Sequence, residues 1–314
     1  MIANEKQMKK TQFKGVLMLL LTALIWGAAF VAQSVGMENV GAFTFNGIRM
    51  LLGAVVLLPF ILIRDRIVIK NLSSDQLKAK QATDKRTILY GLILGIVFCA
   101  ASNFQQFAFY YSTAGKIAFI TALYIFFVPL LGLFLKKRVS LLTWLCVLIG
   151  FIGLYFLCIN PNDVNAINKG DLLAVICSLL FAIHILMVEK FSPKVDGLKL
   201  SCTQFAVSGI LSCILMLLFE TPTVSAVKGA TLPLLYSGIL SCGLAYTLQI
   251  VGQKYTEATV ASLLLCMESV FAVLSAALLL HEMLTGREIL GCCIMFAAII
   301  FSQFSELLAA KKST

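Results

Sequence analysis

Residues 110–138, YYSTAGKIAFITALYIFFVPLLGLFLKKR, align without a gap to residues 254–282, KYTEATVASLLLCMESVFAVLSAALLLHE. The alignment pairs Gln105 with Gln249 just upstream, Tyr111 with Tyr255 and Phe127 with Phe271. The identity is low, but the apolar pattern is the same in both stretches. This match indicates that the chain contains one structural unit twice.

The composition predicts an integral membrane protein. Of the 314 residues 60% are hydrophobic and only 13% are charged, whereas a soluble domain carries about 25% charged residues. A helix needs about 20 mainly apolar residues to cross the hydrocarbon core. Ten such runs lie near residues 15–35, 41–63, 87–112, 116–135, 141–159, 170–190, 199–219, 229–251, 258–280 and 286–306. The charged segment between the second and third runs, residues 64–86, is predicted to be a loop.

The repeat sets the relation between the two halves. Residues 15–35 match residues 170–190, with Trp26 over Phe181, so we place one repeat in residues 1–160 and the other in 161–314. Each repeat has five spans, and because five is odd, the second begins on the opposite side of the membrane. The predicted fold is therefore all-α, with ten transmembrane helices in two inverted-topology five-helix repeats. In secondary transporters of this architecture the substrate site lies near the midplane, between the repeats.

Basic residues predict the orientation. The formal net charge is +10, and 20 of the 25 Lys and Arg residues fall in the termini and loops of one side, against four on the other. Cytoplasmic loops of membrane proteins retain Lys and Arg. We therefore expect a multi-pass cell-membrane protein with both termini in the cytoplasm, and we interpret the positive charge as a topology signal rather than a nucleic-acid site.

Three stretches resemble a known family. They are ALIWGAAFVAQSVGMENVGAFTFNGIRMLLGAVVLLPF (23–60), NFQQFAFYYSTAGKIAFITALYIFFVPLLGLFLKKRVS (103–140) and MESVFAVLSAALLLHEMLT (267–285). They resemble the drug/metabolite transporter superfamily, in its EamA-like branch, and the similarity spans nearly the whole chain. The resemblance implies a ten-helix fold and export of small metabolites, often amino acids or related compounds.

Two ionisable residues lie deep in apolar runs, where charge usually marks function. Arg49 interrupts the second run, and Glu268 lies near the middle of the ninth. They would neutralise one another, or Arg49 would hold a substrate carboxylate through its planar fork of donors. Glu268 would bind a substrate ammonium or take up a proton. The structural alternatives are that Arg49 ties its helix to backbone carbonyls and that Glu268 is a packed structural acid.

Uncharged polar and aromatic residues extend the candidate site. Amides and rings at membrane depth bind substrate or serve as interhelical packing and hydrogen-bonding groups, and the sequence leaves both readings open. The substrate-binding candidates of this kind are Asn103, Gln106, Gln249, Trp26, Tyr124 and Tyr246. His184, inside the sixth run, is a proton-relay candidate beside Glu268, with a hydrogen-bonded neutral imidazole as the alternative.

Glycine and proline predict local helix geometry. Gly91 and Gly95 form a small face that lets a neighbouring helix approach closely. Pro129 frees a backbone carbonyl and is predicted to bend its helix, while its repeat mate is Val273.

The motif inventory favours transport. The sequence has no phosphate-binding loop, no hydrolase or metalloprotease motif and no Cys/His metal-ligand cluster, so we expect no cofactor and no metal. The leading hypothesis is a secondary transporter with a small-molecule substrate, working in the lipid bilayer, with protons as candidate coupling ions. A membrane-embedded enzyme and a passive channel are the alternatives. Assembly into a homodimer is left open.

Overall fold

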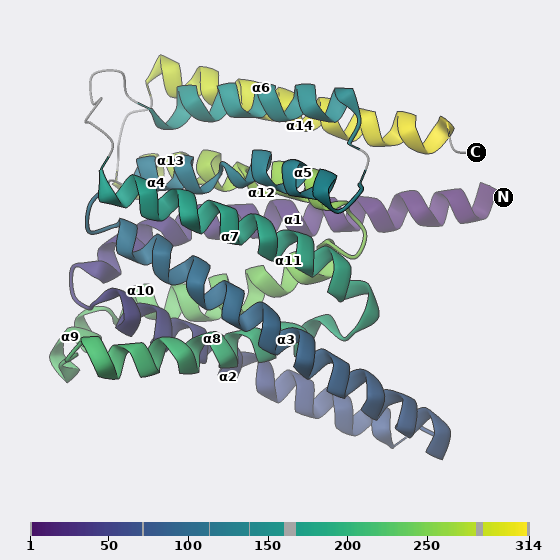
Figure 1. The fold of residues 1–314 in the computed structure, drawn as a ribbon, viewed down its shortest axis with the longest axis horizontal. Helices are drawn as coiled ribbons and strands as arrows, with labels where there is room; N and C mark the ends of the chain where they lie inside the picture. The colour runs from purple at the N-terminus through teal and green to yellow at the C-terminus, as the bar shows by residue number, and fades with distance from the viewer. Residues whose placement is uncertain are drawn as a thin grey trace.

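The computed structural model describes residues 2–70, 72–112, 114–137, 139–159, 168–280 and 285–312, and all regular secondary structure in these ranges is helical (Figure 1). The boundary predicted between residues 160 and 161 lies outside the described residues. The elements are α1 (Ile2–Met37), α2 (Ala42–Ile69), α3 (Ser74–Ala108), α4 (Ala114–Thr121), α5 (Tyr124–Phe134), α6 (Leu141–Cys158), α7 (Lys169–Phe191), η2 (Ser192–Lys194), α8 (Gly197–Phe219), α9 (Val224–Gly229), α10 (Thr231–Leu235), η3 (Tyr236–Ala245), α11 (Tyr246–Gly252), α12 (Ala258–Leu265), α13 (Met267–Leu280) and α14 (Gly286–Lys312).

The described helices have the length and apolarity of a membrane bundle. Eight segments are long and apolar enough to cross a membrane, and Leu141–Phe156 is a shorter apolar helix. Large apolar side chains such as Phe60, Leu217 and Phe296 are exposed on the outside. Because a water-soluble protein rarely exposes so much contiguous apolar surface, these faces are suited to lipid.

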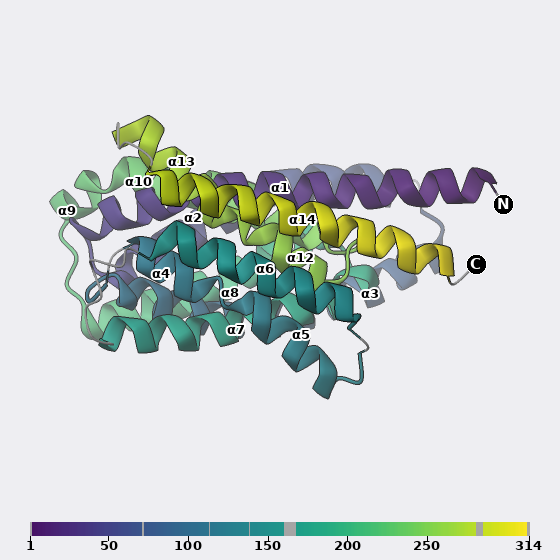
Figure 2. The ribbon, with the colours of Figure 1, turned by 90° about the horizontal axis from the view of Figure 1, so that it is seen from above.

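The packing of the helices follows an inverted repeat. Helix α1 packs on α13, and its counterpart α7 packs on α5; α3 packs on α8, and its counterpart η3 packs on α2. Helices α2 and α8 pack on each other, as do α6 and α14, which lie side by side at one edge of the bundle (Figures 1 and 2). Helix α7 runs opposite to α1 (Figure 1). The ten predicted runs thus form two five-helix repeats of inverted topology.

Both ends of the chain lie at one end of the bundle, which we call the terminal side (Figures 1 and 2). The α2–α3 hairpin projects from the same side. The prediction of a loop over residues 64–86 is wrong: α2 continues to Ile69 and α3 begins at Ser74. Ser73 and Gln76 form a reciprocal capping box that starts α3 there. Charge indicates exposure to water, but it does not exclude a helix.

Ion pairs fasten the hairpin to the start of α8. Lys80 Nζ lies 3.0 Å from Asp65 and 2.9 Å from Asp84, and Lys199 Nζ lies 2.5 Å from Asp65 and 2.7 Å from Asp84. At the opposite side, Glu220 follows α8 and reaches the start of α2. The α2–α8 pair is therefore held by carboxylates at both of its ends.

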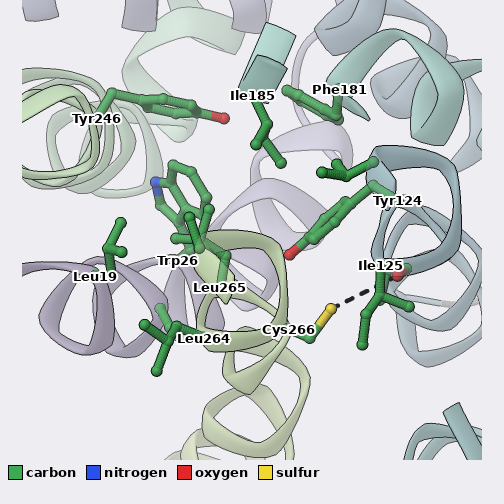
Figure 3. Packing of buried hydrophobic residues seen from close by; sticks show 14 of the residues in the cluster. Leu19, Trp26, Tyr124, Ile125, Phe181, Ile185, Tyr246, Leu264, Leu265 and Cys266 are labelled. Carbon is green, nitrogen blue, oxygen red and sulfur yellow. Dashed lines mark hydrogen bonds between the residues drawn. The ribbon is translucent and has the colours of Figure 1, made fainter. Parts of the chain in front are cut away.

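Two helices are broken near the middle of the bundle at equivalent positions. The α4–α5 helix turns at Ala122 and Leu123, and the α12–α13 helix turns at Cys266, the repeat mate of Ala122. The Cys266 thiol donates a hydrogen bond to the Ala122 carbonyl, 3.6 Å away (Figure 3). The break lies upstream of Pro129, through which α5 continues. Discontinuous helices of this kind line binding sites in many secondary transporters.

The predicted small face on α3 is confirmed. A Cβ at Gly91 would lie 2.5 Å from the Thr203 Cβ, and one at Gly95 would lie 2.7 Å from the Val207 Cβ. Both neighbours belong to α8, so the two backbones are closer than any larger residue would allow.

Candidate functional site

A cavity lies between the two repeats, beside the helix breaks. Its empty volume is about 470 Å³, space open to solvent included. The described residues that line it come from both repeats: Trp26, Ala29, Phe30, Gln33, Arg49, Gln105, Thr121 and Tyr124 from the first, and Phe181, Ile185, Ser241, Tyr246, Gln249 and Glu268 from the second.

Repeat mates meet in this cavity. Each of four aligned pairs has both members in the lining: Trp26 with Phe181, Phe30 with Ile185, Gln105 with Gln249, and Tyr124 with Glu268. Mates face one another only where a pseudo-two-fold axis passes between the repeats. The cavity therefore lies on that axis, at the depth of the broken helices.

Arg49 is a buried cation without a carboxylate partner among the described residues. Its side chain is 2% exposed. Nε donates to Asn46 Oδ1 at 2.8 Å, and the guanidinium lies 5.7 Å from the centre of the Phe45 ring. No ion pair joins Arg49 to Glu268 in the described part of the chain. The guanidinium is thus anchored on its Nε edge, and Arg49 is one of the residues that line the cavity.

Glu268 lies on a different wall of the cavity. It is 4% exposed and accepts a hydrogen bond from the Tyr124 hydroxyl at 3.0 Å. It lies in the first turn of α13, directly after the helix break. The helix dipole favours negative charge at such a position. The Glu268 carboxyl group therefore offers a hydrogen-bond acceptor to a substrate in the cavity.

Aromatic rings form the apolar wall. The rings of Trp26 and Tyr246 have centroids 4.3 Å apart, and Phe98 packs edge-on against Tyr246 at 4.7 Å. Figure 3 shows Trp26, Tyr124 and Tyr246, which belong to three different helices, around one space. The Trp26 Nε1–H is buried, and no described residue accepts a hydrogen bond from it. This wall can accommodate an apolar group and still offer polar atoms at its edge.

The comparisons with known proteins agree with this architecture. The model of the EamA-like transporter family matches residues 13–159 and again residues 168–304. The chain belongs to the EamA-like transporter family. Transport, and not enzymatic catalysis, is the activity of this family, so the prediction that the protein is not an enzyme is confirmed.

Two EamA-related chains and one solved structure illustrate the similarity. An uncharacterized transporter of Archaeoglobus fulgidus is 29% identical over 288 residues, covering 90% of this chain and 83% of the relative. Uncharacterized transporter YoaV of Bacillus subtilis is 23% identical over 299 residues, covering 93% and 97%. A crystal structure that is 17% identical matches with a TM-score of 0.75 over 96% of this chain and 99% of that one, which shows the common fold.

Three predicted site residues of this EamA-like transporter lie outside the cavity lining. Asn103 donates to Ser212 Oγ at 3.0 Å and accepts from Asn46 Nδ2 at 3.0 Å, between α3, α2 and α8. Gln106 is fully buried, and its side-chain nitrogen and oxygen have no hydrogen-bond partner in the described ranges. His184 Nε2 lies 3.0 Å from Gln204 Oε1.

The cavity of this EamA-like transporter also includes polar residues that were not predicted. Gln105 Nε2 donates to Thr121 Oγ1 at 3.4 Å, while Gln33 and Ser241 contribute from α1 and η3. The repeat alignment marks Gln105, because its mate Gln249 was already a candidate. Gln33, Thr121 and Ser241 have no signal of their own in a single sequence.

Proposed function

We propose that this EamA-like transporter exports a small carboxylate-bearing metabolite, such as an amino acid or a related compound, by alternating access. The observation that carries the proposal is Arg49, a cation 2% exposed in a cavity between the repeats, with no carboxylate partner among the described residues. Burying an unpaired charge is costly. A substrate carboxylate would supply the missing partner to the two terminal nitrogens.

The other walls suit a zwitterion. Glu268, with the Tyr124 hydroxyl beside it, offers acceptors for an ammonium group. Trp26 and Tyr246 accommodate an apolar side chain, and the amides of Gln105 and Gln249 offer both donors and acceptors. Because the cationic and anionic groups belong to different walls and form no ion pair with each other, both remain available to one ligand.

Alternating access follows from the repeat symmetry. Two inverted repeats have two equivalent packings, which open the central site to opposite sides in turn. The energy would come from the metabolite gradient or from exchange for protons. Glu268 is the proposed proton carrier because it lies in the cavity, and His184 remains a second candidate.

The proposed orientation places the terminal side in the cytoplasm. The basic residues of the α2–α3 hairpin and of both termini lie there, as expected for loops that are not translocated. Export then means binding from the terminal side and release on the opposite side.

A metabolite screen tests the function. Cells that overproduce the protein should accumulate in the medium one carboxylate metabolite that cells without it retain. The purified protein in liposomes should then show counterflow of that labelled metabolite, which requires a carrier. Flux without counterflow would indicate a channel, and unchanged pools together with no flux would contradict the proposal.

A further inference from the structure

The cavity is not symmetric about the axis that relates the repeats. Ala29, Gln33 and Arg49 line it, but their mates in the same register, His184, Val188 and Gln204, do not. That register holds in the helices themselves, since α2 starts after Gly41 and α8 after its mate Asp196. All three mates are 0% exposed.

This asymmetry gives the open direction. Helix α1 runs from the terminal side, so Gln33, which follows Trp26, lies further from that side. Arg49 lies near the start of α2, also toward the opposite side. The cavity therefore extends from the middle of the bundle away from the termini. The equivalent space toward the terminal side is closed.

Contacts of Glu189, at the end of α7, join helices on that closed side. Its carboxylate accepts from the Ala258 backbone N–H at the start of α12, at 3.0 Å, and pairs with Lys137 beyond α5. One turn away along α7, the Ile185 carbonyl accepts from Gln253 Nε2 at 3.2 Å. The repeat mate of Glu189 is Ser34, which has no carboxylate. At the equivalent place in the first repeat, between α1 and α4, the described residues therefore have no counterpart of the Glu189 link.

Behind this link lies an incompletely bonded polar pair. His184 Nε2 and Gln204 Oε1 are 3.0 Å apart, but His184 Nδ1 and Gln204 Nε2, both buried, have no hydrogen-bond partner among the described residues. Buried polar groups are normally satisfied, and each exception needs an explanation. With the Gln204 amide oriented as it is here, the neutral imidazole donates from Nε2, so Nδ1 is a free acceptor and the amide Nε2 a free donor.

We propose that His184 and Gln204 form a second binding position for the transported metabolite, exposed when the Glu189 contacts break and the opposite half of the bundle closes over Ala29 and Arg49. This inference rests on the proposed alternating access. The free amide nitrogen of Gln204 would donate to a carboxylate oxygen, and His184 Nδ1 would accept from an amino group. The two positions differ in charge: the open one is cationic through Arg49 and the closed one is neutral.

Site-resolved labelling tests the exposure. Single variants His184→Cys and Ala29→Cys are labelled with a membrane-impermeant maleimide in sealed vesicles of known sidedness, and modification at each position is quantified by peptide mass spectrometry, so the native cysteines stay. Each variant is combined with Glu189→Ser, which installs the residue of its own repeat mate. Glu257→Ser is the matched control, because Glu257 is an exposed carboxylate that caps α12 without a side-chain hydrogen bond.

The expected result is reciprocal. With Glu189→Ser, labelling of position 184 from the terminal side rises about tenfold, as expected when a charge-assisted hydrogen bond is lost, and labelling of position 29 from the opposite side falls. Glu257→Ser changes neither. The proposal would be overturned if position 184 stayed unlabelled while labelling of position 29 fell. It would also be overturned if Glu189→Ser left the labelling of both positions unchanged. Gln204→Cys repeats the test should the His184 variant not fold.

Binding is tested in vesicles that contain a Val188→Cys, Glu189→Ser variant, which keeps both His184 and Gln204, with a mixture of the common amino acids. Slower labelling of position 188, which is buried on the same helix, supports a binding position, and an unchanged rate there contradicts it. Counterflow of the amino acids by the wild-type protein is measured in parallel. Absent counterflow with reciprocal labelling would refute the proposed substrates and leave the conformational exchange intact, so the two failures are distinguishable.

Discussion

At the scale of residues, the side chain of Arg49 is fixed by a chain of amides. Asn46 accepts from its Nε and in turn donates to the Ser102 carbonyl and to Asn103 Oδ1, both at 3.0 Å. Asn103 continues the chain to Ser212 on α8. The guanidinium is therefore preorganised, which lowers the entropy lost when it binds a carboxylate. Asn103 would act on substrate through Arg49 and not by contact.

We expect Arg49→Lys to lower the flux of the identified substrate by roughly tenfold or more, because an ammonium keeps the charge but loses the planar fork and the bond to Asn46. Counterflow in liposomes measures the effect, with thermal unfolding in detergent as the check on folding. Arg64→Lys is the control, since Arg64 pairs with Asp196 at 2.6 Å outside the cavity. Wild-type flux in Arg49→Lys would remove Arg49 from the mechanism.

Glu268→Gln should retain exchange of substrate and lose the response of flux to a pH gradient. The amide resembles the protonated acid and keeps a hydrogen-bonding partner for Tyr124, but it cannot release a proton. Flux is measured in liposomes with and without an imposed pH gradient, and Glu257→Gln serves as the exposed control. A variant that still responds to the gradient would exclude Glu268 as the proton carrier.

At the scale of elements, the start of α2 depends on a carboxylate from another helix. Glu220 accepts from the backbone N–H groups of Phe43 and Thr44, at 3.0 and 2.8 Å, and from the Thr44 hydroxyl at 2.6 Å. Gly41 leaves room for it, because a Cβ there would lie 2.4 Å from Glu220 Cδ. These contacts supply the N-terminal cap that α2 lacks in its own sequence.

Glu220→Ala should therefore destabilise the protein by about 1–2 kcal/mol, the usual effect of losing a helix cap. The measurement is the unfolding midpoint in detergent. Glu38→Ala is the matched control, an exposed acid at the end of α1 near the same connection. Equal midpoints for the two variants would show that the cap contributes nothing to stability.

Some element boundaries could be predicted and others could not. The ten apolar runs predicted the helices, because runs of membrane length are a strong signal, and the repeat alignment predicted the inverted topology. The breaks at Ala122 and Cys266 have no proline or glycine to mark them, whereas Pro129, which does, lies inside a continuous helix. The Cys266 thiol, bonded to the Ala122 carbonyl, joins the two breaks, and a single sequence does not report such a contact between distant segments.

The candidate site was predictable in part for the same reason. Because charged residues are rare in lipid-embedded segments, the sequence alone identified Arg49 and Glu268 as candidates. Both line the cavity. Adjacent amides on one helix point in different directions, so Gln105 lines the cavity while Gln106 does not. That choice depends on the rotation of α3 against α7 and α8. Only the repeat mate of Gln105 contained a hint of it.

At the scale of the whole molecule, the charge distribution predicts which end faces the cytoplasm. Asp75→Cys, in the first turn of α3 at the terminal side, should react with an impermeant thiol reagent only after the cells are opened. Val224→Cys, in α9 at the other end, should react in intact cells. Peptide mass spectrometry separates these positions from native cysteines. The reverse pattern would overturn the orientation.

The α2–α8 pair, held by carboxylates at both ends, affects how movements of the helices can be measured in this transporter. Glu220 ties one end of the pair to Thr44, and Asp65 ties the other to Lys199. Because contacts hold both ends, we expect the two helices to keep their separation and relative tilt while other helices move. Spin labels on the lipid-facing surfaces of these two helices should therefore give the same distance in every state of the transport cycle. That distance can serve as an internal reference for the movements of the other helices.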